Sequence, residues 1–163
     1  MKIGLISDTH GYMDERIRHY FKTCDEIWHM GDIGNPIVTG ELKEIAPLKV
    51  VFGNIDDIAT RKSWSEHLFF SINGLGFLMI HIAGGISKYN PKTVNLIEQH
   101  RPDVLLCGHS HILKVKHDPR FKLLYINPGA AGKHGFHKVR TICTMEIENN
   151  NLTNFKAIEL GSR

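Results

Sequence analysis

Seven side chains with metal-binding groups follow short apolar stretches of this sequence. They are Asp8, His10, Asp32, Asn54, His81, His109 and His111. Carboxylate oxygens combined with imidazole nitrogens suit Mn²⁺, Fe²⁺ or Zn²⁺. Seven ligands are too many for one tetrahedral site with an open position, so the set predicts two ions that share one carboxylate. Sites of this kind hold their ions about 3.5–4 Å apart and support in-line hydrolytic displacement.

Each of these residues also has a structural interpretation when it is considered alone. Asp32 could cap a following helix, Asn54 could belong to a turn, and His81 could be a hydrogen-bonded core histidine. His109 and His111 could be ordinary polar residues at a strand end. The common position of the whole set after apolar runs favours a shared site, because ligands of open α/β sheets bind just outside the carboxyl ends of the strands.

The first sixty residues predict alternating strands and helices that would position the first four of these groups. The expected strands are 2–7, 25–30 and 48–52, and the expected helices are 13–23 and 38–45. Because helical crossovers between strands are almost always right-handed, the three strands should be parallel. Their carboxyl ends should therefore meet at one edge of a sheet.

The pattern changes after Thr60. A turn signal over 73–76 predicts a hairpin between strands 67–72 and 77–81, with His81 leaving the second strand. Pro91 favours the first turn of a helix over 91–100. The remaining expected strands are 104–107 and then, as antiparallel strands, 112–117, 122–126, 140–147 and 152–160.

Composition limits the class of protein. The 163 residues suit one domain over 1–163, long enough to bury a core. The hydrophobic share of 42% and the charged share of 23% are ordinary for a soluble globular protein. The formal net charge of +3 permits an anionic substrate but does not indicate a general nucleic-acid binder, which should show a basic stripe.

The cysteines and the apolar runs indicate a cytoplasmic protein. Cys24, Cys107 and Cys143 are widely spaced and contain no CxxC pair, which favours reduced thiols. Met1 leads directly into the first predicted strand, so no signal peptide is expected. No apolar run approaches the roughly 20 residues of a membrane span, so no membrane association is expected.

The ordered motifs resemble those of the calcineurin-like metallophosphoesterases. The matching motifs are Asp8-x-His10, Gly31-Asp32, Gly53-Asn54, His81 and Gly108-His109-x-His111. The short length, the early first strand and Asn127-Pro128-Gly129 are similar to the small bacterial and archaeal phosphodiesterase branch of that superfamily. The complete set is highly specific, although no single motif is.

The resemblance implies a four-layer α/β/β/α sandwich and two divalent metal ions. Mn²⁺ is expected, with Fe, Zn, Ni or Co as alternatives. The first ion would be held by Asp8, His10 and His111. The second would be held by Asn54, His81 and His109. Asp32 would bridge the two ions, and Asp32, Asn54 and His109 are also expected to be catalytic. The implied reaction is hydrolysis of a small phosphoester by in-line attack of a metal-bridging hydroxide.

The sequence departs from the family pattern at two positions. Ile55 stands where many superfamily phosphatases have a histidine, and it cannot donate a proton to a leaving group. The small phosphodiesterase branch often lacks this histidine too, so the departure narrows the family. Ile82 stands where the family usually has a glycine directly after the equivalent of His81.

A basic, glycine-rich loop over 129–138 follows the last motif and contains Lys133, His134 and His137. It is interpreted equally well as a contact for substrate phosphate and as a solvated hairpin loop.

Two other functions stay open at this point. One is a metal-free scaffold, because the superfamily includes a retromer subunit of similar size that uses this fold to bind proteins. The other is a phosphomonoesterase, which would share the site but needs a protonated leaving group. A homodimer also stays open.

Overall fold

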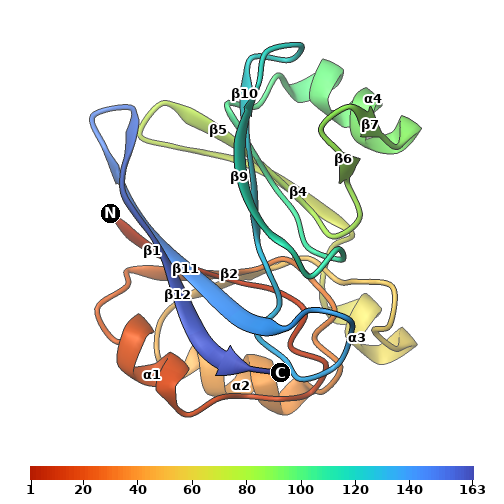
Figure 1. The fold of residues 1–163 in the computed structure, drawn as a ribbon. Coiled ribbons are helices and arrows are strands. Elements are labelled where there is room, and N and C mark those ends of the chain that lie inside the picture. The colour runs from red at the N-terminus through yellow and green to blue at the C-terminus, as the bar shows by residue number, and fades with distance from the viewer.

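The computed structural model describes residues 1–163 and contains two five-stranded β-sheets that pack face to face (Figure 1). In spatial order, the first sheet consists of β12 (Asn151–Ser162), β11 (Val139–Glu148), β1 (Lys2–Ile6), β2 (Glu26–His29) and β3 (Leu48–Val50). The second consists of β4 (His67–Ile72), β5 (Leu75–Ile80), β8 (Val104–Leu106), β10 (Leu123–Pro128) and β9 (Leu113–Asp118).

Helices form the two outer layers. In Figure 1, α1 (Arg16–Phe21) and α2 (Pro36–Lys43) lie against the outer face of the first sheet, and α4 (Pro91–His100) lies against that of the second. The four-layer α/β/β/α sandwich is therefore confirmed. A further short helix, α3 (Ile58–Ser63), follows β3 and was not predicted. None of these helices is long and apolar enough to cross a membrane.

The helix limits follow from local hydrogen bonds. The Asn35 side chain accepts the Ile37 backbone N–H, and Pro36 occupies the first turn, so α2 begins two residues earlier than predicted. The Asp14 carboxylate accepts the Arg16 backbone N–H in a turn just before α1. That turn shortens α1 from the predicted 13–23. The predicted limits of α4 match the structure.

The first sheet has the predicted parallel β1-β2-β3 arrangement. Ile6, Ile27 and Val50 project from these strands into an apolar cluster with Ile17 and Leu42 from the two helices. The chain's C-terminal hairpin extends the sheet, because β11 pairs antiparallel with β1 and with β12.

The structure corrects two sequence predictions for the second sheet and adds a pair of short strands outside it. The β4–β5 hairpin turns on Asn73 and Gly74 alone, both with positive φ (47° and 78°), so the residues at 75–76 belong to β5. β10 pairs parallel with β8 and antiparallel only with β9, so it does not belong to a purely antiparallel set. The two-residue strands β6 (Gly84–Gly85) and β7 (Lys88–Tyr89) pair with each other and were not predicted.

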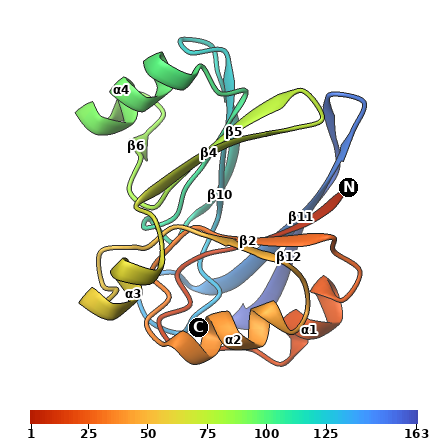
Figure 2. The same cartoon turned by 180° about the vertical axis from the view of Figure 1, so that it is seen from behind.

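The main core lies between the two sheets. Leu5 and Trp28 from the first sheet are fully buried against Phe77, Met79 and Leu106 from the second. In both cartoon views the carboxyl ends of β1, β2 and β5 converge on the side of the molecule where α3 lies (Figures 1 and 2). The packing of the sheets therefore brings strand ends from both of them to one place.

Candidate metal centre

The loops that carry the predicted ligands have an unusual backbone. Positive φ angles of 47–67° occur at Asp8, His10, Asp32, His109 and His111. Non-glycine residues seldom adopt this left-handed region, and those that do concentrate at functional sites. Cross-loop hydrogen bonds hold two of these residues, from Asp8 N to Gly31 O (3.0 Å) and from His10 N to Asp32 O (3.0 Å). The loops are therefore held in conformations that turn their side chains toward one point.

One group of side chains joins the ends of β1, β2 and β8. Ligand atoms of Asp8, His10, Asp32 and His111 all lie within 4.8 Å of one another. His111 Nε2 is 3.1 Å from Asp8 Oδ1, and His10 Nε2 is 3.6 Å from Asp32 Oδ2. The two imidazole Nε2 atoms of His10 and His111 are 3.3 Å apart.

A second group shares Asp32 with the first. Ligand atoms of Asp32, His81 and His109 also lie within 4.8 Å of one another. His81 Nε2 is 3.2 Å from Asp32 Oδ1 and 3.1 Å from Asn54 Oδ1. The structure thus brings all seven predicted residues to one centre, with Asp32 between the two groups.

The donor set fits divalent cations. The Asp8 side chain is fully buried and that of Asp32 is 3% exposed, yet their ion-pair partners are histidines only. Buried carboxylates require a compensating positive charge. The Nε2 atoms of His10, His81 and His111 face these carboxylates, an arrangement that suits a divalent metal ion.

The hydrogen-bond partners of His81 determine which of its nitrogens faces the centre. His81 Nδ1 donates to the Met30 carbonyl at 2.7 Å, so Nε2 is directed at Asp32 and Asn54. A ring held in this way by its other nitrogen is typical of metal-ligating histidines.

His137, from the basic loop, fixes in the same way which nitrogen of His111 faces the centre. The Gly132 carbonyl can only accept, so His137 Nε2–H donates to it (3.0 Å) and leaves His137 Nδ1 as an acceptor. That Nδ1 is 3.2 Å from His111 Nδ1, which must therefore carry the shared proton. The free electron pair of His111 is then on Nε2, the atom that faces Asp8. Sequence reasoning identified the loop but not this contact.

Burial and charge act in opposite directions on the titratable groups. Burial lowers the pKa of His10 and outweighs the nearby charges of Asp32 and Asp8, which raise it. Burial also opposes a charged His81, but the hydrogen bond to Asp32 and the carboxylate charges outweigh it, so the His81 pKa is raised. Burial would raise the pKa of Asp32, yet the interactions with His81 and His10 lower it. The Asp32 carboxylate is therefore ionised at neutral pH.

Two buried residues that the sequence analysis did not single out support the loops. The Asp56 carboxylate accepts N–H bonds from Gly34 (2.9 Å) and Gly53 (2.7 Å), which ties the loop after β2 to the loop after β3. His29 is fully buried, and its Nδ1 accepts from Gly31 N while its Nε2 donates to Thr9 Oγ1. Burial lowers the pKa of His29 to about 4, so it acts as a neutral hydrogen-bonding group.

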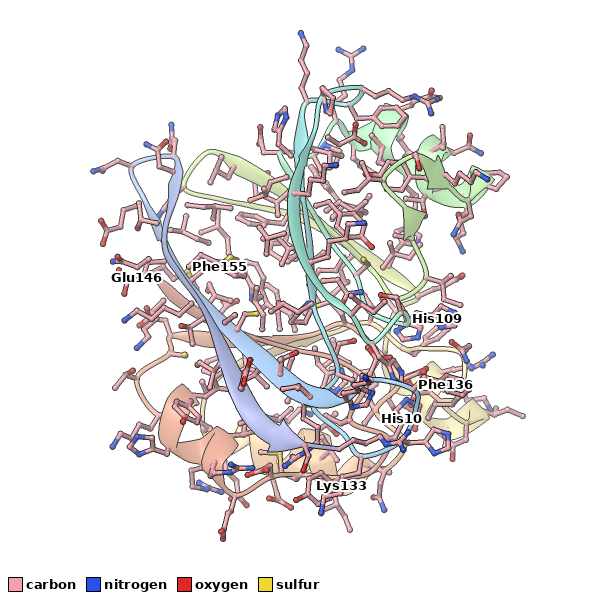
Figure 3. The ribbon with its side chains drawn as sticks, viewed as in Figure 1. His10, His109, Lys133, Phe136, Glu146 and Phe155 are labelled. Atoms are coloured by element: carbon pink, nitrogen blue, oxygen red, sulfur yellow. The ribbon has the colours of Figure 1, made fainter.

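The two departures from the family pattern both lie at the mouth of the centre. The Ile55 side chain is 45% exposed, while its backbone N–H donates to Asp32 Oδ1 at 3.1 Å. Ile82 is 39% exposed. Figure 3 shows His10, His109 and the exposed Phe136 on this side of the molecule.

The chain is similar in sequence to known proteins. The family model of the calcineurin-like phosphoesterase superfamily domain matches residues 1–150. A probable metallophosphoesterase of Methanocaldococcus jannaschii is 30% identical over 137 residues, which cover 80% of this chain and 68% of that protein.

Solved structures share the fold. An archaeal phosphodiesterase has a TM-score of 0.78 at 22% identity, with 98% of this chain and 100% of that chain covered. Vps29 of Entamoeba histolytica in complex with Zn²⁺ has a TM-score of 0.76 at 18% identity, with 98% of each chain covered.

Proposed function

This chain belongs to the calcineurin-like phosphoesterase superfamily, and from this premise we propose that it is a two-metal phosphodiesterase acting on a small phosphodiester. The observation that carries the proposal is the position of Asp32, which is common to two ligand groups drawn from both sheets. A carboxylate shared in this way suits two closely spaced ions better than one.

We assign Asp8, His10 and His111 to the first ion and Asn54, His81 and His109 to the second, with Asp32 between them. Two divalent ions, with Mn²⁺ expected, supply charge neutralisation for the phosphoryl oxygens and a nucleophile at neutral pH. The residues of the chain contribute by holding the ligating side chains in position. The residues assigned to the first ion form the first half-site, and those assigned to the second ion form the second half-site. The Asp8 carboxylate accepts the His109 backbone N–H at 3.1 and 3.2 Å, which links the two half-sites.

A phosphodiester is favoured over a phosphomonoester because Ile55 stands where many superfamily phosphatases have a histidine, and the small phosphodiesterase branch that the chain resembles often lacks this histidine too. The Ile55 side chain is exposed and has no proton to donate. Asp56, the acid beside it, is buried and accepts two backbone N–H groups, one on each carboxylate oxygen.

The test is hydrolysis of bis(p-nitrophenyl) phosphate and p-nitrophenyl phosphate by metal-stripped protein, with Mn²⁺, Co²⁺, Ni²⁺ or Zn²⁺ added separately. We expect turnover of the diester that appears with added metal and disappears with chelator. Absence of hydrolysis with every metal would favour the scaffold instead. Metal binding alone does not distinguish the enzyme from the scaffold, because a Vps29 has been solved with Zn²⁺.

Acidification should empty the second half-site before the first. A metal ion competes with a proton for each histidine. The pKa of His81 is raised, so it takes up a proton at higher pH than His10, whose pKa is lowered. In a His10→Asn variant, which retains the second half-site, bound Mn²⁺ should therefore be lost at higher pH than in a His81→Asn variant. The metal content of both variants is measured at equilibrium between pH 8 and pH 5, which gives the pH at which each has lost half of its Mn²⁺. Equal values for the two variants would contradict the expectation.

Removing the His137 contact should weaken binding of the first ion. We expect His137→Leu to lower Mn²⁺ affinity by about 10–100-fold, as loss of a hydrogen bond to a ligating histidine usually does. His137→Asn places an amide oxygen near the original Nδ1 and should retain most of the affinity. Phe136→Leu is the matched control from the same loop, since Phe136 is fully exposed. Chelator competition gives the affinities; equal losses in the Leu and Asn variants would rule out the hydrogen bond as the cause.

A further inference from the structure

A pocket of about 470 Å³ adjoins the second half-site. Asn54 and His81 form part of its wall, so a molecule whose phosphate reaches the metal centre also reaches this pocket. The volume lies within the range of about 300–1,000 Å³ that is typical of small-molecule sites.

Much of the remaining wall is apolar. Phe52, Ile80, Ile82 and Pro91 line the pocket. Ile82 follows the ligand His81 directly and is 39% exposed, so part of this apolar side chain contacts solvent. Covering such a surface with an apolar group is favourable, because it removes apolar area from water.

The cationic groups of the pocket already have partners. Arg61 donates to the backbone carbonyls of Asn54 and Asp56 at 2.7 Å each, and its guanidinium lies 5.4 Å from the Phe52 ring centroid. Lys92 is paired with Glu66 at 2.5 Å. An uncharged apolar group can occupy the pocket with all of these contacts left in place.

We propose that this pocket binds an apolar organic group of the phosphoester, of about the size of an aromatic ring, and that Ile82 is the residue that selects it. The inference rests on the proposed function and adds the chemical class of the substrate. Ile82 is one of the two positions where the sequence departs from the family pattern. The proposed contact between Ile82 and the substrate is therefore a feature of this chain and not of the shared set of metal ligands.

Phosphonates test this proposal without requiring turnover. Phenylphosphonate and methylphosphonate carry the same metal-binding head group and one organic group each, so no second group can occupy the pocket. Calorimetric titration of the Mn²⁺-loaded protein gives both dissociation constants. We expect phenylphosphonate to bind about tenfold more tightly than methylphosphonate, in line with the value of a modest apolar contact.

Variants locate the origin of that preference. Ile82→Ser should remove most of the preference for phenylphosphonate, and Ile82→Val should remove part of it, with methylphosphonate binding unchanged in both. Val115→Ser is the matched control, because Val115 is 42% exposed, about as much as Ile82. Val115 does not line this pocket, and it does not line the neighbouring pocket to which Ile82 also contributes. Metal content and thermal melting of each variant show that the centre and the fold are retained.

The outcomes separate this inference from the proposed function. An equal preference in the wild type and in both Ile82 variants would overturn the inference, as would tighter binding of methylphosphonate. If the phosphonates bind with the expected preference but no ester is hydrolysed, the pocket assignment is retained and the proposed phosphodiesterase function is wrong.

Discussion

Replacing Asp32 with Asn should abolish most phosphoesterase activity and leave neither of the two proposed Mn²⁺ ions tightly bound. Asp32 is the residue common to both ligand groups, and its carboxylate is ionised in a nearly fully buried position. A neutral amide of the same size offers one oxygen and no charge to two dications. We expect a loss in kcat/KM of about 10³-fold, the upper range for removal of one preorganised polar contact at a reacting centre.

The matched control is Asp8→Asn, which alters a residue of the first ligand group and can still accept the His109 backbone N–H through its amide oxygen. This variant should retain one ion in the second half-site, whereas Asp32→Asn should hold neither ion tightly. Metal analysis after dialysis, with melting of the metal-free proteins alongside, distinguishes the two. If Asp32→Asn kept both ions and most of the activity, the bridging assignment would be wrong.

The dependence of rate on the leaving group should be steep in the wild type. An alkoxide leaves slowly unless it is protonated, and general acid catalysis is typically worth about 10²–10⁴-fold. The exposed Ile55 supplies no proton. Both ring nitrogens of His137 are engaged, one with His111 and one with the Gly132 carbonyl. Aryl esters should therefore be hydrolysed far faster than alkyl esters.

A series of esters with graded leaving-group pKa measures this slope. Ile55→His should accelerate the poorest leaving groups by up to about 10²-fold and leave p-nitrophenyl esters almost unchanged. The gain should stay at the low end of the usual range, because the Asp56 carboxylate is buried and already holds the Gly34 and Gly53 N–H groups, so the new ring lacks a dedicated partner.

A shallow slope in the wild type would mean that a proton donor is already present. His134 is then the residue to replace, since it is exposed and its ring centroid lies 5.0 Å from that of His10. Metal content is measured alongside, so that a disturbance of the neighbouring Asn54 is not mistaken for a change in proton transfer.

The amino-acid sequence by itself identified the seven candidate ligands and predicted the elements that precede them. Apolar runs ending in Asp8, Asp32 and His81 are local patterns, and the strands β1, β2 and β5 form where these runs occur. The parallel order of β1, β2 and β3 followed as well, because right-handed crossovers leave few alternatives. Helix α4 was located to its ends because Pro91 marks its first turn.

Only the tertiary structure decided the contacts between distant segments. The sequence does not reveal that β11 pairs with β1, or that β10 runs parallel to β8, because both pairings join strands that are not consecutive in the chain.

The same reason explains what was missed at the centre. His137 meets His111 across 26 residues, and Asp56 meets Gly34 across 22. A side chain that positions a ligand does so through one hydrogen bond whose partner is chosen by packing. Its residue type and its spacing along the chain therefore carry no recognisable pattern, whereas the ligands themselves must all lie at strand ends.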